Sequence, residues 1–265
     1  MYSPTRKRFG QHWLKSEAIL NQIIAAARLC QDDAVLEIGP GTGILTRRLV
    51  ESVSSLVAVE IDRDLCIKLR KLLGDRENFS LIEADILQLD LNNYPHLNKV
   101  VANIPYNITG PILEKLLGTI TNPTGQNYQL IVLLIQKEVA DRLVAQPGSK
   151  TFGALSVRIQ YLADCQLVCR VPAKAFQPPP KVDSAVVSLS PRPFPIVANN
   201  PKHLGTILQL GFANRRKMLR NNLKSLIDGD HLSQLLQEFN LNPQARAEEL
   251  SLTNWIHLSN HLQTD

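Results

Sequence analysis

The chain is 265 residues long, with 44% hydrophobic residues and a formal net charge of +5 at pH 7. This length leaves room for one large α/β domain and a smaller companion, and the hydrophobic content is normal for a globular protein. The longest wholly apolar run, residues 130–135, is far too short to cross a membrane, and the basic N-terminal residues contain no signal-peptide core. We therefore expect a cytoplasmic protein without a membrane anchor.

The cysteines exclude two further classes of protein. Four are present, at positions 30, 66, 165 and 169, and their spacing matches neither a common zinc pattern nor a dense disulfide framework. We expect reduced thiols and no metal site.

The positive charge is unevenly distributed along the chain. Residues 184–227 contain seven Lys or Arg and no acid, and the first sixteen residues also contain no acid. Such a distribution favours a polyanionic partner, although a solvated surface would show the same pattern.

In chain order, the first expected element is a helix over residues 16–29, with Ser16 as its N-cap. A strand at 34–38 then runs into a turn with glycines at 39, 41 and 43, and a helix follows over 44–53. Further apolar runs predict strands at 55–61, 79–84, 99–102, 128–135, 165–171 and 185–189. Helical patterns separate most of these strands, which indicates an α/β fold with a doubly wound sheet.

The strand pattern ends at the proline-rich segment 191–195, and only helical patterns follow it. We therefore expect two domains, one over residues 1–191 and a helical lobe over 196–265.

Three successive strand ends carry groups that suit a nucleoside-bearing cofactor. The glycine turn, with Gly39 and Gly41, lacks the G-x-G-x-x-G spacing that serves a pyrophosphate. Glu60 ends the second strand, where its two oxygens can accept hydrogen bonds from a ribose diol, and Asp85 follows the third strand, where it can accept from an adenine amino group. S-adenosylmethionine meets this description.

The run VVANIPYNIT at 100–109 indicates the methyl acceptor. The exocyclic amine of adenine is a poor nucleophile, because its lone pair is delocalised into the ring. Acceptors around its N–H groups would localise that pair, and the Asn103 side-chain oxygen and the Ile104 carbonyl, aimed by Pro105, can provide them. Tyr106 would stack on the base, which must be unpaired or flipped out.

Several segments together resemble the small-subunit ribosomal RNA adenine dimethyltransferases over nearly the whole chain. They are RFGQHWL (8–14), LEIGPGTGILT (36–46), VEID (59–62), EADIL (83–87), NIPYNI (103–108), QKEVADRLVAQPGSKTFGALSV (136–157), FQPPPKVDSAVV (176–187) and FANRRKMLRNNL (212–223). The resemblance implies a Rossmann-like methyltransferase sheet whose final strand is antiparallel, plus a C-terminal helical domain that binds rRNA.

The resemblance also implies a substrate: two adjacent adenosines in the loop of the 3′-terminal hairpin of small-subunit rRNA, dimethylated at N6 within an immature 30S-type subunit. It places Asn103 between the cofactor and the base, and Phe176 opposite Tyr106 as the second wall of the base pocket. It adds His12 and Leu14 to the cofactor contacts. The family usually has Gln-Asn-Phe-Leu where this chain has Gln-His-Trp-Leu, so a backbone contact is the safer expectation for His12.

The late basic segment 215–227 predicts an RNA-binding helix. Its apolar stripe would consist of Leu219, Leu223, Leu226 and Ile227, and its RNA-binding cations would be Arg215, Arg216, Arg220 and Lys224. The last three of these cations would form one solvent-facing row at i, i+4 and i+8.

Two alternative functions stay open on the sequence. A large-subunit rRNA adenine methyltransferase of the macrolide-resistance type shares the glycine turn and the NIPY motif. An RNA-binding assembly factor without activity could retain the same fold. Oligomeric state cannot be read from the pattern, and a monomer is the default expectation.

Overall fold

The computed structural model describes residues 11–262. Residues 8–10 of the first motif and the basic residues at 6–8 lie outside this range. The chain divides into two compact units. The first comprises residues 1–118, 124–140 and 165–191, and the second comprises 119–123, 141–164 and 192–265. The second unit thus includes residues 141–164 as well as the expected lobe, and the predicted limits of the two domains stay a prediction.

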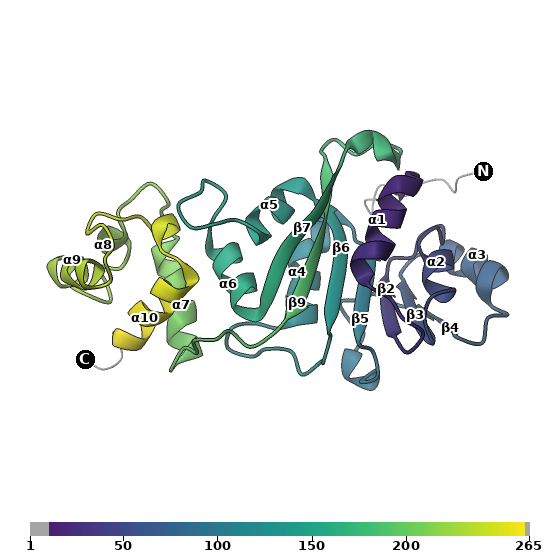
Figure 1. The fold of residues 1–265 in the computed structure, drawn as a ribbon, viewed down its shortest axis with the longest axis horizontal. Helices are drawn as coiled ribbons and strands as arrows, with labels where there is room; N and C mark the ends of the chain where they lie inside the picture. Colours follow the sequence, from purple (N-terminus) through teal and green to yellow (C-terminus); the bar gives the residue numbers. More distant parts are fainter. Residues whose placement is uncertain (1–10, 263–265) are drawn as a thin grey trace. The chain divides into compact units, whose positions relative to one another are not determined.

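The first unit is built on a seven-stranded sheet in the order β4-β3-β2-β5-β6-β9-β7 (Figure 1). Its strands are β2 (Ala34–Ile38), β3 (Ser55–Glu60), β4 (Phe79–Glu83), β5 (Lys99–Asn103), β6 (Leu130–Gln136), β7 (Ala163–Val171) and β9 (Ser184–Pro191). Neighbours among β2 to β6 pair in parallel, whereas β9 pairs antiparallel with β6. The predicted Rossmann-like sheet and its antiparallel final strand are confirmed.

The helices of this unit form between the strands. They are α1 (Glu17–Ala27), α2 (Thr46–Val50), α3 (Arg63–Leu73) and α4 (Thr109–Leu117), with short 3-10 turns at Leu91–Asn93, Tyr106–Ile108 and Ala173–Ala175. Helix α5 (Lys137–Leu143) begins in this unit, and its last three residues belong to the second. Ser16 caps α1 as predicted, because its hydroxyl accepts a hydrogen bond from the Ile19 N–H. The helix expected over 44–53 is shorter: α2 has five residues, since the glycine turn continues into its predicted start.

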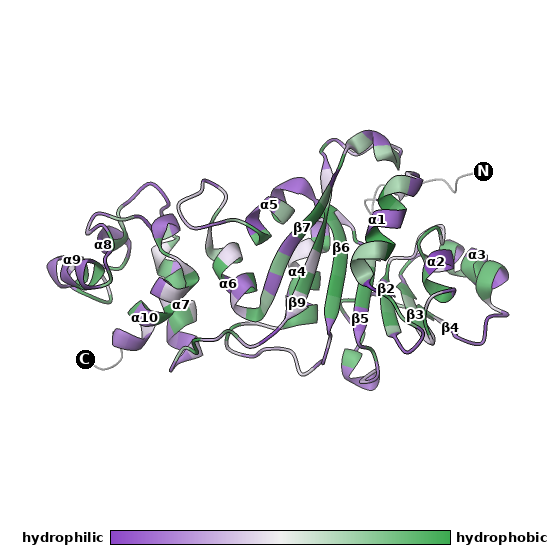
Figure 2. Ribbon diagram, viewed as in Figure 1, coloured by the Kyte–Doolittle hydropathy of each residue, from purple (hydrophilic) through white to green (hydrophobic). Residues whose placement is uncertain are grey.

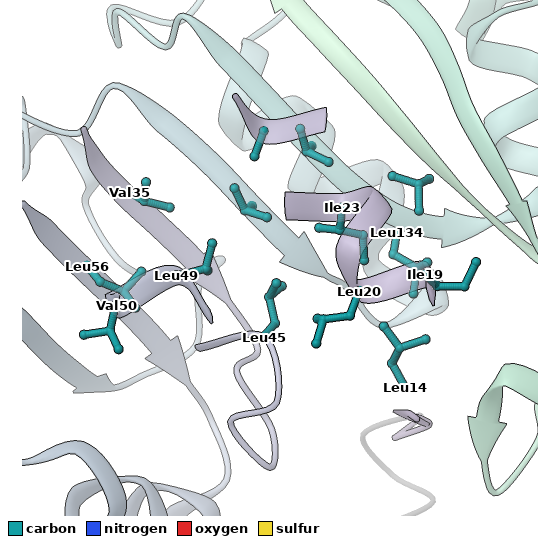
Figure 3. Packing of buried hydrophobic residues seen from close by; sticks show 14 of the residues in the cluster. Leu14, Ile19, Leu20, Ile23, Val35, Leu45, Leu49, Val50, Leu56 and Leu134 are labelled. Carbon is teal, nitrogen blue, oxygen red and sulfur yellow. The ribbon is translucent and has the colours of Figure 1, made fainter. Parts of the chain in front are cut away.

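Burial explains why the sheet forms from these runs. All five residues of β2 are buried, as are the first six of β6, so both faces of the central strands are covered. In Figure 2 these two strands are mainly hydrophobic, with Glu37 as the exception within β2, and this is the pattern expected of a sheet covered on both sides. Figure 3 shows Leu20 and Ile23 of α1 packed toward Leu134 of β6, and Leu49 of α2 near Leu56 of β3.

The helices of the second unit are α6 (Ala154–Leu162), α7 (Pro201–Gly211), α8 (Leu219–Asn222), α9 (Gly229–Glu238) and α10 (Leu252–His261), with a 3-10 turn at Ala247–Glu249. Its core contains Trp255, which is fully buried and lies 5.4 Å from the Phe212 ring between centroids. A Cβ on Gly211 would lie 2.4 Å from the Trp255 ring, so close packing of α7 on α10 requires glycine there.

Candidate active site at the strand ends

A cavity of about 220 Å³ opens at the carboxyl ends of β2, β3, β4 and β5. Parallel sheets of this topology bind ligands at this edge, because loops diverge there between strands whose order reverses. The structure brings all the site residues predicted for this unit to its lining: His12, Leu14, Gly39, Gly41, Glu60, Asp85, Asn103, Ile104, Pro105, Tyr106 and Phe176.

The glycine turn contributes to the lining of this cavity. Gly39, Gly41 and Gly43 have φ angles of +68°, +59° and +80°, a region that side-chain-bearing residues rarely adopt. A Cβ on Gly41 would lie 2.6 Å from the Trp13 ring. The turn therefore needs glycine at position 41 both for its backbone angle and for the space that the indole occupies.

Glu60 is 5% exposed, and both of its carboxylate oxygens already accept backbone hydrogen bonds. Oε2 accepts from the Gly41 N–H at 3.1 Å, and Oε1 accepts from the Asp62 N–H at 2.9 Å. Burial raises the pKa of this carboxyl, and the two backbone donors oppose that shift. These bonds fix the carboxylate against the glycine turn, and each oxygen keeps a second lone pair for a ligand hydroxyl.

Asp85 is half-buried on the loop after β4. Its Oδ1 accepts a hydrogen bond from the Leu87 N–H at 2.9 Å, which orients the side chain at the cavity edge.

Sequence reasoning missed Glu37, an acid inside the apolar strand β2 that also lines the cavity. It is 1% exposed, and burial, together with the charge of Glu60, raises its pKa to about 8. Thr46 lies close enough to lower this pKa somewhat, but neither its hydroxyl nor the Glu37 Oε2 has a hydrogen-bond partner of normal geometry among the described residues. The signal in the sequence was a lone acid within AVLEI, directly before the glycine turn.

Asn103 is the last residue of β5 and is half-buried at the cavity. Within residues 11–262, no hydrogen bond uses its side-chain amide, which leaves the amide free for a ligand. The next peptide is fixed, because the Ile104 N–H donates to the Leu134 carbonyl at 3.3 Å. The Pro105 carbonyl accepts from the Ile108 N–H, and this turn leads into α4.

Tyr106 is held by two side chains from distant parts of the chain. Its hydroxyl pairs with the Ser184 hydroxyl of β9. The His12 ring lies 6.2 Å away between centroids, at an interplanar angle of 20°. Burial raises the pKa of the Tyr106 hydroxyl, and the Asp183 charge adds to this shift, so the phenol stays protonated.

A second, two-stranded sheet positions His12 beside Tyr106. Strand β1 (Trp13–Leu14) pairs antiparallel with β8 (Phe176–Gln177), a pairing that the sequence did not reveal. His12 Nδ1 lies 2.8 Å from the Pro178 carbonyl oxygen, which can only accept, so Nδ1 carries the hydrogen. The pairing joins the QHWL and FQPPP motifs, which are far apart in the sequence.

Phe176 is more deeply buried than a wall of an open base pocket would be. Its ring is 1% exposed and belongs to the hydrophobic core, where Leu14 is its partner in the β1–β8 register. It contributes to the cavity wall without presenting an open face, and its role opposite Tyr106 stays a prediction.

The prediction that residues 215–227 form one helix is wrong. Only α8 is helical, and the chain before and after it forms turns. Asn222 causes part of this break, because its amide donates to the Gly211 and Asn214 carbonyls and folds the chain back. Leu226 was expected to pack but is 43% exposed.

The cations of this segment therefore do not form one helical row. Arg216 and Lys224 are exposed, Arg220 is half-buried, and Arg215 uses its guanidinium to bind backbone carbonyls within the second unit. Their predicted contact with RNA stays a prediction.

Comparison with known proteins decides the family. Residues 3–264 match the family described as "Ribosomal RNA adenine dimethylase". The chain belongs to this family. A Rippkaea orientalis protein named "Ribosomal RNA small subunit methyltransferase A" is 62% identical over 98% of both chains, and a Nostoc protein of the same name is 62% identical over 97% of both.

Two solved structures share the fold over nearly the whole chain. A dimethyladenosine transferase from Plasmodium falciparum is 27% identical, with a TM-score of 0.78 over 95% of this chain and 97% of that one. The 23S rRNA methyltransferase ErmE is 25% identical, with a TM-score of 0.75 over 95% and 99%. The predicted family resemblance and enzyme class are confirmed: the chain is an S-adenosylmethionine-dependent rRNA adenine dimethyltransferase.

The cavity fits this cofactor. At Gly39 the backbone of the turn is open, since a Cβ there would meet only the Asn103 carbonyl oxygen, at 3.8 Å. The buried Glu37 Oε2, which has no hydrogen-bond partner among the described residues, offers a polar group in the cavity wall. In the part of the chain that the structure describes, no group of acids, histidines and cysteines could hold a metal ion. No helix in that part is long and apolar enough to cross a membrane.

Proposed function

We propose that this chain dimethylates N6 of two adjacent adenosines in the loop of the 3′-terminal hairpin of small-subunit rRNA. The observation that carries this proposal is the 62% identity, over 98% of both chains, to a relative named for the small ribosomal subunit. The identity to the 23S rRNA methyltransferase is only 25%, which disfavours the large-subunit alternative. A site with Glu60, Asp85 and Asn103 at one cavity disfavours an inactive assembly factor.

For binding, we propose that Gly39, Gly41, Glu60 and Asp85 hold S-adenosylmethionine, with His12, Leu14 and Asn103 completing its contacts. When bound, this cofactor supplies a methyl group activated by a sulfonium. Glu60 suits the ribose, because two backbone donors fix its carboxylate while a lone pair remains on each oxygen.

For catalysis, we propose that the Asn103 side-chain oxygen and the Ile104 carbonyl accept hydrogen bonds from the adenine N6 amine. This localises the nitrogen lone pair and aligns it with the methyl carbon. The hydrogen bond from Ile104 N–H to Leu134 O supports the role of the neighbouring carbonyl, because it fixes the orientation of the chain after β5. No strong base is required, since the amine becomes acidic as the methyl group is transferred and its proton can leave to water.

Tyr106 and Phe176 would enclose the base. Because the His12 ring lies nearly parallel to Tyr106, a stacked adenine would use the opposite face of the phenol. The pocket must also readmit an amine that already carries one methyl group, since dimethylation requires two transfers.

We further propose that the enzyme acts in the cytoplasm as a monomer on an immature 30S-type subunit. The basic segment of the second unit suits this partner, because its exposed cations can contact RNA phosphates.

The decisive experiment is mass spectrometry of rRNA after unmethylated small subunits are incubated with the enzyme and methyl-labelled S-adenosylmethionine. We expect two adjacent dimethyladenosines in the 3′-terminal hairpin. Label in large-subunit rRNA, or only monomethyladenosine after exhaustive reaction, would contradict the proposal. If the folded protein binds S-adenosylmethionine but transfers no label to either subunit, this result would favour the alternative that it is an inactive assembly factor.

A further inference from the structure

One side chain of the cavity lining, His12, departs from the usual family segment. Where the family usually has Asn, this chain has an imidazole that makes two contacts at once. Its Nδ1 donates to the Pro178 carbonyl at 2.8 Å, and its ring lies 6.2 Å from the Tyr106 ring between centroids, at an interplanar angle of 20°. An asparagine could replace the donor but has no ring to lie against Tyr106.

The imidazole is anchored by the two-stranded sheet. Strand β1 follows His12 directly and pairs with β8, and the Lys15 N–H extends this pairing by donating to the Ala175 carbonyl at 2.9 Å. The Pro178 carbonyl follows β8 directly, so the sheet sets the distance between the two partners of the His12 hydrogen bond. Because an imidazole N–H lies in the plane of its ring, this bond holds the ring by an edge and leaves a flat face toward Tyr106.

The other contact of Tyr106 does not set the plane of its ring. The Tyr106 hydroxyl pairs with the Ser184 hydroxyl. The axis about which a tyrosine ring turns passes through its Cβ and its hydroxyl oxygen, so a hydrogen bond at that oxygen fixes the far end of the side chain while the ring can still rotate. A neighbour that lies flat against the ring does resist this rotation, and His12 is such a neighbour.

The plane of Tyr106 matters because a base that stacks on it must lie nearly parallel to it. Tyr106 is half-buried and lines the cavity, and no other aromatic ring among residues 11–262 stacks on it. The face opposite His12 is therefore the one that a base would use.

We propose that the His12 side chain is a positioning residue for the base pocket: it sets the plane of the Tyr106 ring, and the target adenine completes a stack of three rings. This role rests on the proposed adenine substrate. It divides His12 into two parts, because its backbone keeps the cofactor contact that the family resemblance implies while its side chain acts on the base through Tyr106. The next residue supports this division, since the Trp13 ring packs on Gly41 of the glycine turn and keeps β1 beside that turn.

Three variants at position 12 separate the ring from the hydrogen-bond donor. His12→Asn restores the usual family residue and keeps a donor without a ring, His12→Phe keeps a ring without the donor, and His12→Ala removes both. We expect single-turnover methyl transfer to unmethylated small subunits to slow by about two- to tenfold in His12→Asn and His12→Ala, the range of a stacked aromatic pair. His12→Phe should recover most of the rate that His12→Ala loses.

The matched control is His96. It is exposed, does not line the cavity and lies beside another tyrosine, with 6.4 Å between the His96 and Tyr94 ring centroids. His96→Asn should leave methyl transfer unchanged. Calorimetry should also show that the S-adenosylmethionine affinity of His12→Asn and His12→Phe stays close to that of the wild type, because the side chain acts on the base rather than on the cofactor.

A double-variant cycle shows whether His12 acts through Tyr106. Once the Tyr106 ring is absent, the imidazole has no ring left to position, so Tyr106→Ala and Tyr106→Ala/His12→Asn should transfer methyl groups at equal rates. A direct contact between the His12 ring and the base would instead make the double variant slower than Tyr106→Ala, by the same factor by which His12→Asn slows the wild type.

The rotation of the Tyr106 ring in the free protein tests the positioning without any substrate. NMR of protein with isotope-labelled tyrosine measures this rotation from the line shapes of the two ring edges, and the spectrum of Tyr106→Phe assigns the signals. We expect faster rotation in His12→Asn and His12→Ala than in the wild type, with much of the restraint restored in His12→Phe.

Each of four outcomes would overturn the inference. Equal losses of rate in His12→Phe and His12→Ala would assign the effect to the donor rather than to the ring. Additive losses in the cycle would place the imidazole against the base, and a loss of cofactor affinity that matches the loss of rate would place it against the cofactor. Unchanged ring rotation in His12→Asn would remove the positioning role. If the wild type methylates neither subunit, it is the proposed function that fails, and the ring rotation in the free protein still decides the role of His12.

Discussion

The cofactor cavity and the basic segment 215–227 are held in place by different kinds of structure. At the cavity, Glu60 and Asn103 stand at the ends of strands paired in register with their neighbours, so the sheet sets their spacing. In the basic segment, a four-residue helix lies between turns, and the orientation depends on single contacts such as those of Arg215 and Asn222. A site at the ends of paired strands can thus keep its geometry when one contact is lost. The geometry of a site on turns depends on each of these single hydrogen bonds.

The largest expected effect is at the centre of the cavity. Asn103→Ala should slow methyl transfer by roughly 10²- to 10³-fold, because the lost acceptor acts mainly in the transition state. Single-turnover kinetics measures the rate, and calorimetry should show S-adenosylmethionine affinity within a few fold of wild type. Asn93→Ala, at an exposed asparagine that does not line the cavity, should leave the rate unchanged. Near-normal dimethylation by Asn103→Ala would remove Asn103 from the catalytic group.

The next prediction concerns the pH dependence of stability that the buried Glu37 carboxyl causes. Its pKa is about 8 when folded, against 4.5 as its ordinary value, so between these pH values the folded chain holds one proton more than the unfolded chain. The free energy of unfolding should therefore fall as pH rises through this window, by up to about 1.4 kcal/mol per pH unit. Glu37→Gln should reduce that fall to the part that comes from Glu60, whose pKa burial also raises, as measured by denaturant titrations at pH 5, 6.5 and 8.

The control for this prediction is Glu77→Gln, since Glu77 is exposed on the same unit. It should leave the pH profile as it is in the wild type. A Glu37→Gln profile that falls as steeply as that of the wild type between pH 5 and 8 would place the titrating group elsewhere.

Gly41 tests whether the turn depends on the Trp13 contact. Gly41→Ala adds a Cβ 2.6 Å from the indole and at a φ of +59°, so it should destabilise the fold by about 1 to 3 kcal/mol and weaken cofactor binding. Thermal unfolding and calorimetry measure the two effects. Gly110→Ala is the matched control, because a Cβ there meets no atom within 4 Å. Equal melting temperatures for the two variants would show that the turn relaxes freely.

The smallest effect concerns the hydrogen bond between the Tyr106 and Ser184 hydroxyls, which we call the tether. Tyr106→Phe leaves the Ser184 hydroxyl without its partner, and Ser184→Ala does the reverse, so each should slow methyl transfer modestly, by about 1 kcal/mol. Tyr106→Ala should cost more, since base stacking contributes about 1 to 3 kcal/mol. Kinetics of all three variants with the same subunits makes this comparison. A larger loss in Tyr106→Phe than in Ser184→Ala would assign the phenol oxygen a role beyond the tether.

The sheet, and the grouping of residues at its ligand-binding edge, could be predicted from local patterns in the sequence. Long apolar runs with glycine and acidic ends predict parallel strands, and the carboxyl ends of such strands meet at one edge, so Gly39, Glu60, Asp85 and Asn103 could be grouped before any fold was known. Local pattern and topology were sufficient there, because a strand's position in the sheet fixes where its last side chain lies.

The contacts between distant segments could not be predicted from local patterns, because they depend on how the chain folds. Strands β1 and β8 have two residues each, too short for any periodicity, yet their pairing brings His12 to Tyr106 and buries Phe176. Residues 215–227 have a helical pattern but do not form one helix. Arg215 and Asn222 instead donate hydrogen bonds to carbonyls outside this segment, those of Phe152 and Gly211. Long-range contacts of this kind outweigh local propensity, because a short helix gains most of its stability from packing rather than from its own sequence.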